Sequence, residues 1–206
     1  MTDTTATTGL VLTGGGARAA YQVGVLKAIA HLRRDCQVTQ VNPFPVITGT
    51  SAGAINAAAL ASQADDFDAA VGGLCEVWEN FHAEQVYRSD SIGVMRTGAR
   101  WLTMMSLGWI IARWRRAKPR SLLDNEPLSM LLKRFVNTER VRQMRLEGHL
   151  QALAVTASSY GSGLHVTFYD AASDIEPWTR SQRIAVRGSI TADHLLASST
   201  IPTEYR

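Results

Sequence analysis

The sequence is poor in cysteine, with Cys36 and Cys75 as its only two. Two cysteines this far apart form neither a disulfide framework nor the closely spaced ligand pairs of a metal site. We therefore expect the protein to reside in a reducing compartment. The residues give no reason to expect a bound metal.

The sequence also lacks a strong charge of one sign and a long apolar run. Its formal net charge is only +3, too small to indicate nucleic acid as a partner. The polar first eight residues do not resemble a secretory signal. The longest apolar stretch, Trp101 to Ala112, is shorter than the roughly 20 residues of a bilayer span. We expect a cytoplasmic or peripheral membrane protein.

What remains is an ordinary globular composition, with 46% hydrophobic and 19% charged residues among 206. This length suits one domain with a sizeable core. We expect a disordered tail over residues 1–8 and a single domain over residues 9–206.

Short apolar runs alternate with helical patterns along this domain. Strands are predicted at 10–12, 46–48, 150–157 and 164–169. Tyr21, Val25, Ile29 and Leu32 recur at helical spacing, which predicts a helix over 19–33. Further helices are predicted at 52–61, 67–81 and 127–136 and around His194. Strands that alternate with helices indicate an α/β fold with a mainly parallel sheet covered on both faces.

The segment Gly49-Thr50-Ser51-Ala52-Gly53 matches the nucleophile elbow pattern G-x-S-x-G. In such an elbow the serine lies on a sharp turn between a strand and a helix, and glycine on either side avoids a collision of Cβ atoms. A chance match in a loop is the alternative, but the predicted strand before the motif and the predicted helix after it argue against this. Ser51 is the candidate nucleophile.

A glycine loop, Gly14-Gly15-Gly16-Ala17-Arg18, follows the first predicted strand. Consecutive glycines let backbone N–H groups converge on an anion, which can be a phosphate or the oxyanion of acyl transfer. As a dinucleotide fingerprint the loop is incomplete, because Ala19 replaces the third glycine and the expected acidic residue is missing. A downstream candidate nucleophile favours the oxyanion interpretation.

A Ser-Asp-His triad order would need a histidine late in the chain. His165 alternates with apolar residues in a predicted strand, and His194 lies in a predicted helix. Neither is expected to be catalytic.

Together the glycine loop and the elbow resemble the patatin-like phospholipase family, as do the segments 121–128 and 195–202. The resemblance implies a three-layer α/β/α fold and a lipid acyl hydrolase that uses a Ser–Asp dyad without histidine and without a cofactor. It implies that Ser51 attacks the ester and that residues Gly14 to Arg18 form the oxyanion hole, with Arg18 bracing the loop or attracting an anionic head group. The implied partner is a phospholipid or another acyl-ester lipid.

The sequence departs from the family in two places. Ala19 stands where the family often has glycine. The family's catalytic aspartate belongs to an Asp-Gly-Gly or Asp-Gly-Ala motif, and no aspartate of this chain precedes a glycine. Asp170, Asp174 and Asp193 are poor substitutes. We expect a domain that is truncated at its C-terminus and nearly inactive. A lipid-binding remnant and a nucleotide-binding α/β protein are the alternatives.

The segment Trp101–Arg120 combines aromatic and apolar residues with a basic cluster. This composition suits contact with an anionic membrane surface. It suits equally well a buried cap with a solvated basic end, because a helix over residues 101–112 would carry apolar side chains on all of its sides.

Overall fold

The computed structural model describes residues 7–39, 41–80, 132 and 136–199. The predicted helix at 127–136 and the Trp101–Arg120 segment therefore lie outside the described residues, except for Leu132 and Val136, which are both buried.

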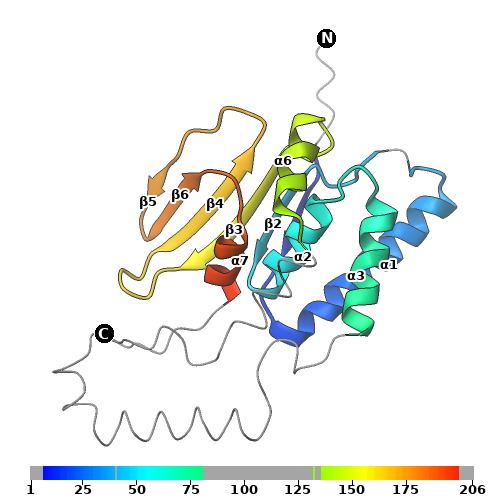
Figure 1. Ribbon diagram of the computed structural model, residues 1–206, viewed down its shortest axis with the longest axis horizontal. Helices are drawn as coiled ribbons and strands as arrows, with labels where there is room; N and C mark the ends of the chain where they lie inside the picture. Colours follow the sequence, from blue (N-terminus) through cyan, green and yellow to red (C-terminus); the bar gives the residue numbers. More distant parts are fainter. Residues whose placement is uncertain (1–6, 40, 81–131, 133–135, 200–206) are drawn as a thin grey trace, which may run out of the picture.

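The described strands form one six-stranded sheet in the order β1-β2-β3-β4-β6-β5, with β5 and β6 at the left in Figure 1 and α1 and α3 at the right. The strands are β1 Gly9–Leu12, β2 Val46–Thr50, β3 Ala152–Ser158, β4 His165–Ala171, β5 Thr179–Arg180 and β6 Arg183–Arg187. Three of the pairings are parallel (β1–β2, β2–β3 and β4–β6), and the other two are antiparallel. The predicted α/β class and mainly parallel sheet are confirmed.

Five helices are described: α1 Ala19–Asp35, α2 Ala52–Ala61, α3 Phe67–Glu79, α6 Thr138–Leu146 and α7 Ala192–Ser199. Asp66 and Asn137 cap α3 and α6 by accepting hydrogen bonds from the backbone N–H groups of Ala69 and Arg140. Such caps satisfy N–H groups that have no partner within the helix.

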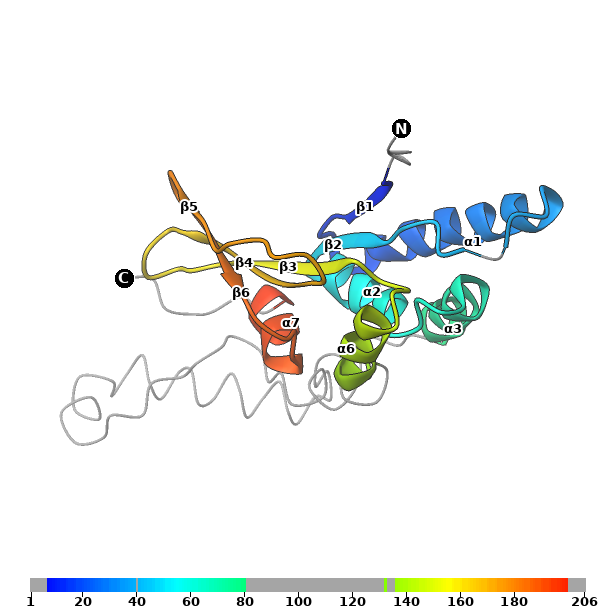
Figure 2. The same ribbon diagram turned by 90° about the horizontal axis from the view of Figure 1, so that it is seen from above.

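The main core lies between the sheet and the helices on one of its faces. In Figure 2, α2, α6 and α7 lie on the same side of the sheet, and α3 packs beside α1. Leu153 and Val155 of β3 are fully buried on this side, and most residues of the alanine-rich α2 are buried as well. Small alanine side chains let α2 approach the strands closely, which matters for the site below.

The opposite face of the sheet carries a smaller cluster within the described residues. Tyr169, Ala171 and Ala185 are buried there, and Trp178 packs against them. The Tyr169 hydroxyl donates a hydrogen bond to the Ile175 carbonyl at 2.6 Å. The loop after β4 is thereby fixed against this face.

The residues that α1 buries are not the apolar residues whose spacing predicted the helix. Val23, Leu26 and Ala30 are buried against the neighbouring helices, whereas Tyr21 and Leu32 are exposed. The helix itself is confirmed, but it carries apolar residues on two sides. Since α2 and α3 contact only one of these sides, periodicity alone could not identify it.

A pair of leucines on α1 tests this assignment. We expect Leu26→Ala to lower the free energy of unfolding by about 2–5 kcal/mol, because Leu26 is 2% exposed and its removal leaves a cavity. Leu32→Ala, at a side chain that is 62% exposed, should change it by less than about 0.5 kcal/mol. Urea denaturation of both variants measures the difference, and equal losses would contradict the assignment.

Candidate active site

Ser51 lies at the turn where β2 ends and α2 begins. Its backbone has φ 54° and ψ −129°, in a region that a residue with a side chain seldom occupies. Such strain persists only where the surrounding structure enforces it, and it is common at functional sites. The side chain is half-buried.

The glycines on either side of Ser51 are required by close backbone contacts. A Cβ added to Gly49 would lie 2.4 Å from the Gly53 carbonyl oxygen, and one added to Gly53 would lie 2.3 Å from the Leu12 carbonyl oxygen. Both distances are far inside van der Waals contact. These contacts are the steric reason for the G-x-S-x-G pattern. Because positions 49 and 53 have no Cβ atom, the first turn of α2 can lie directly against the end of β1.

Strand register brings the glycine loop next to Ser51. Leu12 of β1 pairs with Gly49 of β2, so the residues that follow these two strands leave the sheet side by side. A Cβ added to Gly14 would lie 3.2 Å from the Ser51 Cβ and 4.0 Å from its Oγ. Gly14 and Ser51 are therefore direct neighbours, and glycine at position 14 leaves space beside the hydroxyl.

The rest of the loop is open to solvent. Residues Gly14 to Arg18 are all exposed, and Gly16 to Arg18 form a short 3-10 helix that leads into α1. Gly16 has φ 55°, a conformation that favours glycine. Within the described part of the chain, no turn, loop or cap hydrogen bond is donated by the backbone N–H of Gly14, Gly15 or Gly16. These groups are candidates to hold an anion beside Ser51.

The remaining residues of the elbow differ in accessibility. Thr50 is exposed and Ala52 is half-buried, whereas Gly49 and Gly53 are buried. The elbow therefore presents Ser51 at the surface while its glycines anchor it in the core.

Ser198 of α7 also contacts the elbow. Its hydroxyl accepts a hydrogen bond from the backbone N–H of Ser51 at 2.7 Å and donates one to the Thr156 carbonyl at 2.7 Å. Thr156 pairs with Thr50 in the sheet. Ser198 thus ties the strained residue to the neighbouring strand. Its segment, 195–202, carried the family resemblance, but the sequence assigned it no role.

The two histidines lie in other environments. His165 is exposed, and its Nδ1 lies 3.4 Å from the Ser158 hydroxyl across the β3–β4 pair. His194 Nδ1 accepts a hydrogen bond from the Thr191 N–H at 3.1 Å, and its ring packs on Phe168. Within the described residues, no hydrogen bond joins either histidine to Ser51.

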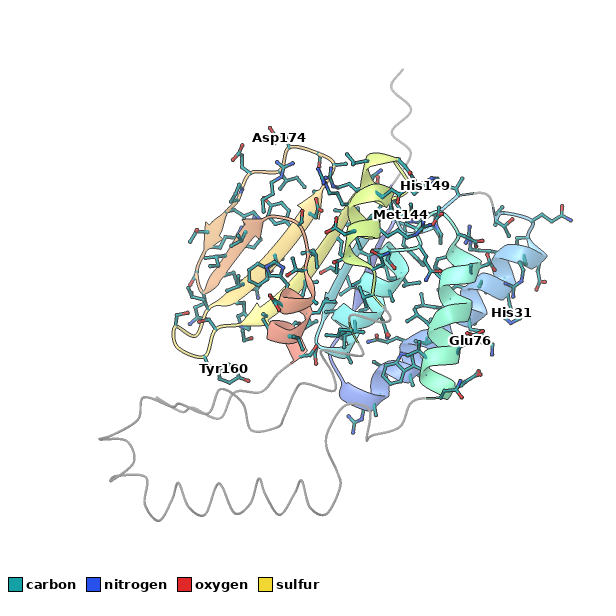
Figure 3. All side chains as sticks on the ribbon, viewed as in Figure 1. His31, Glu76, Met144, His149, Tyr160 and Asp174 are labelled. Carbon is teal, nitrogen blue, oxygen red and sulfur yellow. The ribbon has the colours of Figure 1, made fainter. Side chains whose placement is uncertain are left out.

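Within the described residues, no hydrogen bond joins Asp170, Asp174 or Asp193 to Ser51. Asp170 pairs with Arg145 at 2.8 Å, and Asp174 pairs with Arg187 at 2.5 Å. Asp174 also lies at the opposite end of the sheet from Tyr160, which follows the C-terminal end of β3 (Figure 3). Because β2 and β3 are parallel, Ser51 lies at the Tyr160 end. Asp193 is exposed in the first turn of α7.

The described residues offer no cluster of three or more histidine, cysteine or acidic side chains that could hold a metal ion. Of the helices among them, none has the length and apolar character that crossing a bilayer requires.

Comparison with known proteins gives one family match and two similar structures. Residues 10–205 match the family described as patatin-like phospholipase. No curated protein matches the chain. A crystal structure of full-length ExoU with full-length SpcU, from the type III secretion system of Pseudomonas aeruginosa, is 18% identical over 79% of this chain, with a TM-score of 0.43. A second structure, of the type III effector protein ExoU, is 18% identical over the same share, with a TM-score of 0.37.

The chain spans about a third of the length of these two structures, covering 34% and 35% of them. The family match, by contrast, extends over nearly the whole chain. On that match, the chain belongs to the patatin-like phospholipase family.

Proposed function

We propose that this chain carries the nucleophile and the oxyanion hole of a serine lipid acyl hydrolase. One observation carries the proposal: Gly14 adjoins the Ser51 side chain, with an added Cβ 4.0 Å from its Oγ. A carbonyl group that Ser51 attacks would place its oxygen close to the loop. The same proximity favours acyl transfer over nucleotide binding, because a phosphate loop needs no serine at this position.

The reaction follows from this geometry. Ser51 Oγ attacks the ester carbonyl carbon, its proton passes to a base, and the carbonyl oxygen becomes an oxyanion. The N–H groups of the glycine loop, together with that of Ala52, donate hydrogen bonds to this oxyanion. The tetrahedral intermediate then expels the lipid alcohol, and water releases the fatty acid from the acyl-enzyme. Neither a metal nor an organic cofactor takes part. Arg18, exposed at the end of the loop, braces the loop or attracts an anionic head group.

The base is an aspartate in the family's dyad, and the Asp-Gly motif that supplies it does not occur in the 206 residues. Asp170 and Asp174 are engaged with arginines elsewhere. General-base assistance is typically worth about 10²–10⁴-fold in rate. The 206-residue chain should therefore hydrolyse esters slowly.

A fluorophosphonate probe tests the nucleophile. We expect slow labelling that maps to Ser51 by peptide mass spectrometry and is lost in Ser51→Ala. Ser158→Ala is the matched control, because Ser158 has a histidine beside it but no glycine loop. Labelling that stays in Ser51→Ala would refute the proposed nucleophile.

Ester turnover tests the missing base. Hydrolysis of short-chain p-nitrophenyl esters by the 206-residue chain should remain close to the uncatalysed rate. Rapid turnover that Ser51→Ala abolishes would show that a base lies within these residues.

Ser198 is expected to support the elbow. Ser198→Ala leaves the Ser51 N–H without its partner, which typically costs about 1–3 kcal/mol. We expect fluorophosphonate labelling of Ser51 to fall about tenfold. Ser199→Ala is the matched control, because the Ser199 hydroxyl has no hydrogen-bond partner among the described residues. Equal effects of the two variants would contradict this role.

A peripheral membrane contact is proposed on sequence grounds alone, since Trp101–Arg120 lies outside the described residues. Each basic residue near an anionic surface contributes about 1 kcal/mol. We expect co-sedimentation with phosphatidylserine vesicles at low salt and much less at high salt. Replacing Arg113, Arg115 and Arg116 with glutamine should abolish it.

The control for this experiment makes the same change in charge elsewhere. Arg142, Arg180 and Arg183 are exposed, and their replacement with glutamine should leave vesicle binding unchanged. If both triple variants bind equally well, the segment acts as a cap or a solvated loop instead.

A further inference from the structure

A buried amide lies close behind the site on α2. Asn56 is 1% exposed, and it is the only polar side chain in the otherwise apolar helix Ala52–Ala61. Burying an amide is costly unless its groups form hydrogen bonds. The hydrogen bonds of the Asn56 amide therefore show how this cost is offset.

Asn56 forms three hydrogen bonds, two to residues of α1 and one to a residue of α3. Its Nδ2 donates to the Ala19 carbonyl at 3.3 Å and to the Gln22 Oε1 at 3.2 Å. Its Oδ1 accepts from the Trp78 Nε1 at 2.9 Å. Both amide protons are used, and the carbonyl oxygen has a donor. The side chain thus connects α2 to α1 and α3.

Gln22 extends this chain of amides to the start of the glycine loop. Its Nε2 donates to the Thr13 carbonyl at 2.7 Å. Thr13 directly precedes Gly14, and Ala19 is the first residue after the loop. The network therefore holds the loop at both of its ends, and it does so from the helix that begins next to Ser51.

We propose that Gln22 and Asn56 are positioning residues, which fix the glycine loop at the distance from Ser51 that oxyanion binding requires. This inference rests on the proposed function of the loop. Three consecutive glycines have unusual backbone freedom, and the loop is exposed. An oxyanion hole works only when its donors lie about 2.7–3.1 Å from the oxyanion. Anchors at residues 13 and 19 confine the loop without occupying its N–H groups.

One experiment can distinguish an effect on the position of the glycine loop from an effect on the reactivity of residue 51. In a Ser51→Cys variant, residue 51 carries a thiol, which ionises far more readily than a serine hydroxyl, so that the attacking thiolate needs no separate base. Acylation of this thiolate by a p-nitrophenyl ester passes through an oxyanion, whereas its alkylation by iodoacetamide does not. The ratio of the two rates at residue 51, read by peptide mass spectrometry, reports the oxyanion hole.

The proposed function is tested first, with Ser51→Cys alone. Cys36 is an exposed thiol of the same chain and serves as the internal reference. We expect the acylation-to-alkylation ratio at position 51 to exceed that at Cys36 by at least tenfold. Equal ratios would refute the oxyanion hole, and with it the inference that depends on it.

The network is tested next, by adding Gln22→Met to Ser51→Cys. Methionine has a similar length but cannot hold the Thr13 carbonyl. We expect the ratio at position 51 to fall about 10- to 100-fold, because small displacements of a catalytic group cost this much, while alkylation stays within about twofold. A ratio that stays high in this variant would overturn the positioning role and leave the proposed function intact.

Two further variants guard against a loss of folding. Gln143→Met is the matched control. Among the described residues, the Gln143 amide donates a hydrogen bond only to Glu147, on the exposed side of α6, and the ratio should not change. Trp78→Phe removes the Nε1 donor to Asn56 and should lower the ratio less than Gln22→Met does. Circular dichroism of each variant identifies any unfolded protein. A fall in the ratio as large in Gln143→Met as in Gln22→Met would also overturn the positioning role.

Discussion

The candidate site depends on one close backbone contact, in which Gly53 lies against the carbonyl of Leu12. This contact lets the first turn of α2 rest on the end of β1, and every other feature of the site follows from it. The parallel register of β1 and β2 then delivers the glycine loop and Ser51 to the same point. A side chain at position 53 would separate the elements that carry the two groups.

Hydrogen bonds from distant parts of the chain surround this contact. Ser198 holds the strained Ser51 from α7, and Asn56 and Gln22 hold the glycine loop from two helices. The groups that would do chemistry are carried by short, exposed or strained segments, while the groups that hold them lie on regular elements. Precision in such a site comes from its rigid support.

Local chemistry made part of the site predictable from the sequence. The elbow and the glycine loop are each a short continuous segment whose residue types follow from steric requirements. Both could therefore be identified without knowledge of the tertiary structure. Asn56 left only a weak signal, as a polar residue in an alanine-rich helix. Ser198 lies in a segment that resembles the family, but its role could not be predicted, because its partner Ser51 is 147 residues away.

The fold was predictable to a similar degree. Strands and helices with strong apolar patterns were identified. The short strands β5 and β6 were not, and neither was helix α6, in which three of nine residues are arginines. Helix α1 shows the underlying limit. Two apolar stripes run along it, and only the packing of α2 and α3 decides that Leu26 is buried and Leu32 exposed.

A crystal structure of the chain with a phosphonate bound to Ser51 would show whether the glycine loop forms the oxyanion hole. We expect a phosphoryl oxygen about 2.7–3.1 Å from N–H groups of the glycine loop, with the loop anchored at Thr13 and Ala19 by Gln22 and Asn56. An adduct whose oxygens all point to solvent, away from Gly14 to Gly16, would contradict it.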